Sequence, residues 1–161
     1  TTGFPVRAVI LDPDMDVLHW TDEYRTIAAV MTPVTRASRE RLLGHAADLR
    51  GAIHSAFAEV PDIDMYGLGF MLHYRLAESH MQAGENSAAT REFELALANA
   101  TRCTDRLPWL YFHVARLAKG AGDESRLRWA VGAAASADSL AGGHSGVPAL
   151  TRGLLAATGG S

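Results

Sequence analysis

The side chains best suited to acid–base chemistry in this 161-residue sequence are histidine and tyrosine. Imidazole changes charge near neutral pH, so histidines and a tyrosine that converge in a cavity could transfer protons or bind a small polar molecule. The candidates for such a pocket are His73, His80, His113 and Tyr74. Histidines buried for structural reasons are the competing interpretation, because a single sequence cannot show that these side chains converge.

Metal and nucleophile chemistry finds less support. His73 and His80 are seven residues apart, too far on one helix to bind a metal ion as an i,i+4 pair. The single cysteine, Cys103, excludes an internal disulfide, and no base for a thiolate nucleophile is identifiable. We therefore expect no catalytic residue, no metal site and no cofactor, and a non-catalytic protein is favoured over an enzyme.

An acidic segment near the start of the chain has part of a calcium-loop pattern. Asp12, Asp14, Asp16 and Glu23 occupy positions 1, 3, 5 and 12 of that loop. However, Val17 stands where the loop needs glycine for its sharp turn. An acidic turn between two strands is the preferred interpretation, and it predicts a short β-hairpin over residues 5–11 and 16–20.

Composition narrows the class of protein further. Hydrophobic residues make up 48% and charged residues 20%, which excludes wholesale disorder. A net charge of −3 gives no basic field for nucleic acid or an anionic membrane, and the cluster of Arg36, Arg39 and Arg41 is interpreted as solvent-exposed. No apolar run approaches the length of a membrane span. We expect a cytoplasmic protein, and the bias to arginine over lysine suggests a bacterial source.

Periodic apolar residues predict helices over the rest of the chain. Residues 1–20 form an N-terminal arm, and residues 21–161 form a helical domain. Within it, two flanking helices fill 21–60, one ending before Pro33 and a longer one over 38–59. Two helix pairs fill 64–140, the first helix starting at Asp62 or Asp64 and ending at Gly84. A capping helix follows over 146–157, so the predicted fold class is all-α with an N-terminal β-hairpin.

The helical region contains an internal repeat. Its first copy reads Leu76-Ala77-x-x-His80-x-x-x-Gly84-x-x-x-x-Ala89-x-x-x-Phe93-x-x-Ala96. A second, weaker copy starts thirty-eight residues later with Val114-Ala115-x-x-Ala118-x-x-x-Gly122, followed by Leu127, Val131 and Ala134. Small residues let two helices approach, and the glycine allows a tight turn between them.

This spacing resembles the tetratricopeptide repeat over residues 70–140. The resemblance implies antiparallel helical hairpins that bind a peptide or protein partner on the surface formed by the first helix of each pair. The sensing or partner-binding part of a regulator is one such role. The residues that the resemblance places on this surface are Met71, Tyr74, Glu78, Met81, Gln82, Trp109, Phe112, Arg116 and Lys119.

Three alternatives stay open. An ordinary antiparallel bundle could place small residues at helix crossings without forming a repeat. The histidine and tyrosine side chains could instead line a pocket between helices, in a small-molecule-binding protein or an enzyme. A homodimer could also form, with the N-terminal hairpin paired across subunits along its exposed edge.

Overall fold

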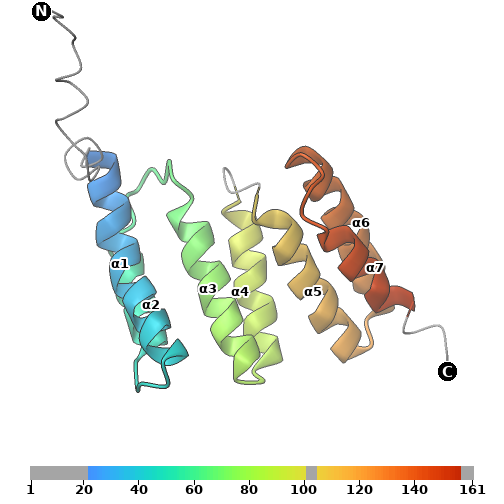
Figure 1. Ribbon diagram of the computed structural model, residues 1–161, viewed down its shortest axis with the longest axis horizontal. Helices are drawn as coiled ribbons and strands as arrows, with labels where there is room; N and C mark the ends of the chain where they lie inside the picture. The colour runs from blue at the N-terminus through green and yellow to red at the C-terminus, as the bar shows by residue number, and fades with distance from the viewer. Residues whose placement is uncertain (1–21, 101–104, 157–161) are drawn as a thin grey trace, which may run out of the picture.

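The computed structural model describes residues 22–100 and 105–156, with the side chains of 22 and 23 left out. This part of the chain is all-helical, with seven α-helices and no strand, so the predicted all-α class is confirmed. The predicted β-hairpin of residues 5–20 lies outside the described residues. Figure 1 shows the helices standing side by side in chain order, from α1 and α2 at one end to α6 and α7 at the other.

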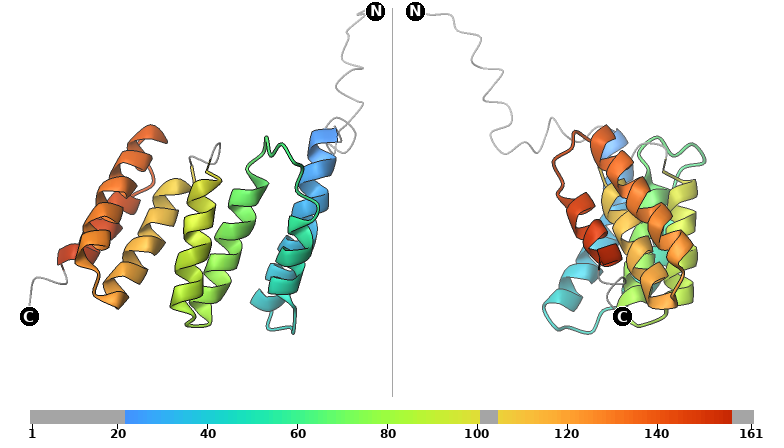
Figure 2. Two further views of the ribbon diagram at one scale, coloured as in Figure 1. Left: turned by 180° about the vertical axis from the view of Figure 1, so that it is seen from behind. Right: turned by 90° about the vertical axis from the view of Figure 1, so that its right-hand side faces the viewer.

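The helices pack as neighbouring pairs. The helices of the row are α1 (Asp22–Leu42), α2 (Leu49–Phe57), α3 (Leu68–Gln82), α4 (Asn86–Ala98), α5 (Leu107–Ala121), α6 (Glu124–Leu140) and α7 (Val147–Ala156). The closest packing joins α3 to α4 and α5 to α6, and α1 packs on α2. The last helix, α7, packs on both α5 and α6, and the edge-on view in Figure 2 shows it beside α6.

Equivalent glycine turns close the first helix of the two central pairs. Gly84 and Gly122 have φ angles of 76° and 72°, a region that glycine enters without steric cost. The Gly84 N–H donates to the carbonyl of Met81 at 3.1 Å and the next N–H to that of His80 at 3.0 Å. The same two bonds follow Gly122, so both hairpins turn through a Schellman motif, and the predicted helix end at Gly84 is confirmed.

The flanking helices differ from their prediction. The expected end before Pro33 and the expected long helix over 38–59 are both wrong, because α1 continues through Pro33 to Leu42. Val30 and Val34, one turn apart on either side of the proline, are buried, and their packing offsets the backbone hydrogen bond that Pro33 cannot donate. The chain breaks instead at Gly44, whose φ of 79° ends the helix.

A carboxylate fixes the start of α3 at Leu68, later than the predicted start at Asp62 or Asp64. Oδ1 of Asp64 accepts the N–H of Leu68 at 2.9 Å, and Oδ2 accepts that of Gly69 at 2.8 Å. These bonds satisfy N–H groups that have no acceptor within the helix. Asp64 thus acts as the cap of α3 from four residues upstream.

Two apolar cores stabilise the row. The N-terminal core joins α1, α2 and the near side of α3 through Val30, Val34, Ile53, Leu68, Leu72 and Leu76. The C-terminal core joins α3 to α6 through Phe70, Tyr74, Phe93, Leu110, Val114 and Leu127. Met71 packs against both cores, and the repeat positions Ala77, Ala89 and Ala96 are fully buried. None of the helices in the described ranges is long and apolar enough to cross a membrane.

Candidate functional site

The first helices of successive pairs contact one another and form a continuous surface. The helix α1 packs on α3, and beneath the surface the largely buried rings of Tyr74 on α3 and His113 on α5 meet with centroids 5.9 Å apart. We call this the first-helix surface and define it by Arg41, Arg75, Glu78, Trp109, Phe112 and Arg116.

The α5 part of this surface is an aromatic cluster. The rings of Trp109 and Phe112 meet edge to face with centroids 5.9 Å apart. The guanidinium of Arg116 lies 5.9 Å from the centroid of the Phe112 ring, within the range of a cation–π contact. Trp109 is 37% exposed, and Arg116 is also exposed. This cluster offers a partner a large apolar ring beside a positive charge.

The α3 part of the surface borders a pocket between α1 and α3. It has a volume of about 230 Å³ and is lined by Ser38, Arg41, Leu42, Leu49, Arg75, Glu78, Ser79 and Gln82. Glu78 lies between this pocket and the aromatic cluster. It pairs with Arg75 at 3.1 Å and lies 3.9 Å from Nε2 of His113, whose ring centroid is 5.7 Å from that of Phe112. Two of the predicted surface residues, Glu78 and Gln82, therefore line the pocket.

Four other predicted surface residues have structural contacts. Tyr74 is only 8% exposed and belongs to the C-terminal core, where its ring meets those of Phe70 and Phe93. Met71 and Met81 are half-buried and pack against the cores. Nζ of Lys119 donates to the carbonyl of Leu154 at 3.1 Å, so this lysine connects α5 to α7. Tyr74 and the two methionines therefore stabilise the helices through the cores, and Lys119 fixes α7 to α5.

The histidines of the alternative pocket have different partners. Nδ1 of His73 lies 2.8 Å from Glu92 on α4, and Nδ1 of His80 lies 2.5 Å from Glu85 in the turn between α3 and α4. His113 packs instead among aromatic rings, with Tyr74 as one neighbour. Of the four residues, the structure brings Tyr74 and His113 together and directs the other two elsewhere.

Burial keeps both members of that pair neutral. Burial, with a smaller effect of Arg116, lowers the pKa of His113 to about 4. Burial also raises the pKa of Tyr74 well above its usual value of 10, and the nearby Glu78 carboxylate adds to this. At neutral pH the contact of His113 with Glu78 is therefore not an ion pair, and 3.9 Å is too long for a hydrogen bond. Neither group changes charge near pH 7.

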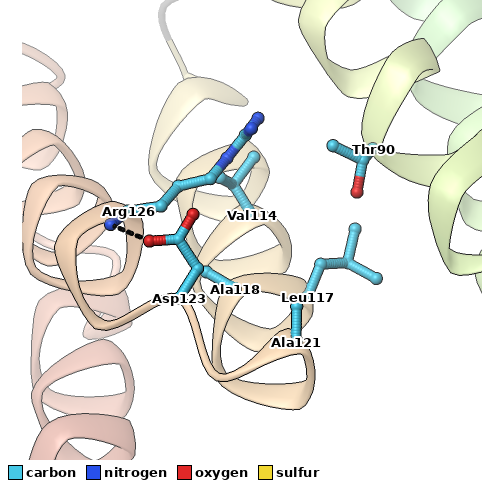
Figure 3. A pocket seen from close by; sticks show the side chains of 7 residues that line it. All are labelled: Thr90, Val114, Leu117, Ala118, Ala121, Asp123 and Arg126. Carbon is cyan, nitrogen blue, oxygen red and sulfur yellow. Dashed lines mark hydrogen bonds between the residues drawn. The ribbon is translucent and has the colours of Figure 1, made fainter.

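A second hollow lies between α4, α5 and α6 and has a volume of about 110 Å³. Figure 3 shows Thr90 of α4 on one side, and Asp123 and Arg126 on the other. The polar groups here have partners, because Asp123 caps α6 by accepting the N–H of Arg126 at 2.9 Å and Arg126 pairs with Glu94 at 2.6 Å. This hollow is small and its charges are already compensated, so the pocket between α1 and α3 is the better candidate site of the two.

Within the described ranges, no three histidine, cysteine or acidic side chains are grouped closely enough to hold a metal ion. The chain matches no protein-family model, no curated protein and no solved structure.

Proposed function

We propose that this chain is a non-catalytic, tetratricopeptide-like module that binds a peptide or protein on its first-helix surface. One observation carries the proposal: Glu78, which lines the pocket between α1 and α3, also contacts His113, and the His113 ring lies beside that of Phe112 in the aromatic cluster on α5. An extended peptide could contact both places at once.

The repeated hairpin supports the tetratricopeptide-like part of the proposal. The sequence repeat places Gly84 and Gly122 at equivalent positions, and both close the first helix of a pair through the same two backbone bonds. Pairs that pack on their neighbours along a row expose one helix of each pair on a common surface.

The chemistry of the surface supports the binding role. Tryptophan and arginine are the residues most often found to dominate the energy of protein interfaces. Trp109 and Arg116 are exposed on either side of Phe112, so they can contact a partner without unfolding the domain. Met71, Met81 and Tyr74 pack in or against the apolar cores and hold the helices in place.

The test is selection of binding peptides from a random library, followed by calorimetric titration of the selected peptide. Trp109→Ala is expected to weaken binding by about tenfold or more, the usual effect of losing an interface anchor. Trp129→Ala is the matched control, because Trp129 is 51% exposed on α6 and lies outside the first-helix surface. Equal affinity of wild type and the Trp109 variant, or equal loss in both variants, contradicts the proposed surface.

A further inference from the structure

We propose that two copies of this chain pair through the side of α1 that faces away from the N-terminal core, at one end of the row of helices (Figure 1). This side carries an open groove with a volume of about 460 Å³. We call it the α1 groove and define it by Ala28, Ala29, Thr32, Pro33, Arg36 and Glu40. The pairing does not depend on the proposed function, because the α1 groove shares no lining residue with the pocket between α1 and α3.

The α1 groove is apolar at a place where a helical row normally ends in a polar surface. A terminal helix has no further neighbour in the row to cover its outer side, which is therefore usually polar. Here Ala29, Thr32 and Pro33 are exposed in the middle of that side. Their short side chains allow a second helix to approach closely, because the side chains at the contact set the distance between two packed helices.

A large apolar side chain lies on the same side of α1. Leu43 is 58% exposed, and its N–H donates to the carbonyl of Arg39 at 3.0 Å, so it continues the turns of the helix. Glu40 and Arg36 precede it at steps of three and four residues, and Pro33 lies a further three residues back. Side chains at such steps share one side of a helix. Each copy therefore presents both an exposed leucine and a groove of small residues that can receive one.

The charges in the α1 groove complement one another across two copies. Within the described ranges, no carboxylate lies within ion-pair distance of Arg36, although Glu40 is only one turn away. Oε2 of Glu40 lies 2.6 Å from Nδ1 of the exposed His45, and its other oxygen can accept from a further donor. Each copy can therefore offer the other one cation and one carboxylate.

A two-fold axis at the level of Ser38, with the two α1 helices antiparallel, brings both sets of groups together. Leu43 and Pro33 lie five residues from Ser38 in opposite directions. Glu40 and Arg36 lie two residues from it, also in opposite directions. A two-fold interface uses the same surface on both copies, so each contact occurs twice. Leu43 of each copy then packs at Pro33 of the other, and Arg36 of each meets Glu40 of the other.

The test is sedimentation equilibrium of the full chain over a range of concentrations, in which we expect a monomer–dimer equilibrium. Leu43→Asp should raise the Kd of the dimer by about tenfold or more, because it places a charge in an apolar contact. Leu42→Asp is the matched control, because Leu42 is 88% exposed but lines the pocket between α1 and α3. Circular dichroism checks that each variant is folded.

An exchange of charges tests the two-fold arrangement. Arg36→Glu and Glu40→Arg each place like charges opposite one another, so each variant alone should dimerise at least about tenfold more weakly than wild type. An equimolar mixture of the two variants has opposite charges at both contacts and should form a heterodimer with a Kd near that of wild type. Native mass spectrometry separates the heterodimer from the homodimers, because the two variants differ in mass.

A monomer at every concentration overturns the proposed dimer. A dimer that Leu43→Asp leaves intact also overturns it, because such a dimer uses another surface, as does an equal loss in the Leu42 and Leu43 variants. A mixture of the two charge variants without a heterodimer overturns the antiparallel arrangement. The peptide experiment fails or succeeds separately, because it depends on Trp109 of α5, outside the α1 groove.

Discussion

The imidazole of His113 stacks on the ring of Phe93, with centroids 5.4 Å apart and planes inclined by 9°. This contact joins α5 to α4 at the point where the two central hairpins meet. Nδ1 of His113 is buried there and has no hydrogen-bond partner among the described residues. A polar atom without a partner in an apolar site costs free energy, and the cost rises when the ring is protonated.

Acidification should therefore destabilise the fold through His113. Burial lowers its pKa from 6.5 to about 4, so the unfolded chain binds the proton more tightly than the folded one. The stabilisation is fully present above pH 6.5 and is lost as the pH falls toward 4. We expect the free energy of unfolding in urea to fall by about 2–3 kcal/mol between pH 7.5 and pH 4.5 from this group.

The His113→Phe variant isolates that contribution. Phenylalanine keeps a ring against Phe93 and removes the unpartnered nitrogen. We therefore expect the variant to raise the free energy of unfolding by about 1 kcal/mol at neutral pH. The difference between wild type and variant should then widen at pH 4.5. Parallel pH profiles for the two proteins would assign the acid sensitivity to other groups.

The glycine turn after α5 should be sensitive to substitution. Gly122 has a φ of 72°, and a Cβ there would meet no other atom within 4 Å, so only the backbone conformation resists a side chain. Gly122→Ala should lower the free energy of unfolding by about 1 kcal/mol. Gly120→Ala is the control, since that residue lies within α5 with equally open space. The Gly120→Ala substitution should raise the free energy of unfolding by about 0.5 kcal/mol.

The course of α1 through Pro33 can be checked in the same way. Pro33 is exposed and sits inside the helix, where it removes a backbone donor. Pro33→Ala restores that donor, and we expect it to raise the free energy of unfolding, measured by thermal denaturation, by about 1–3 kcal/mol. Thr35→Ala, at an exposed site on the same helix, is the control. It should raise the free energy of unfolding by at most about 0.7 kcal/mol. A helix that ended before Pro33 would show no such difference.

The cap of α3 gives a further prediction. Asp64→Ala removes the acceptor of the Leu68 and Gly69 N–H groups. It should lower the free energy of unfolding, measured in urea, by about 1–2 kcal/mol. Asp62→Ala, two residues earlier and exposed, should change stability by less than about 0.5 kcal/mol. A similar loss in both variants would show that the effect is one of charge and not of capping.

The predictable part of the fold was the part with strong local signals. Gly84 marks the end of α3 because turn chemistry depends on neighbours along the chain. Pro33 was misleading for the same reason. Its local preference favours a helix end, whereas the burial of Val30 and Val34 depends on α2, which no local pattern reveals.

The candidate site was predictable only where helical periodicity determines exposure. Trp109, Phe112 and Arg116 share one side of α5, and their spacing shows this. Arg41 is exposed, as predicted for it and its neighbours, whereas its hydrogen bond to Ser79 depends on the packing of α1 against α3, which a single sequence does not show. The different partners of His73 and His113 likewise follow from helix packing.

The row-like packing also has a consequence for the kinetics of folding. Helix pairs pack mainly on the pairs next to them in the chain. Such local contacts close small loops, so the search for native partners is short and helical chains of this kind fold in microseconds to milliseconds. Each pair can then serve as a template on which its neighbour condenses, and folding can start at either core and spread along the row.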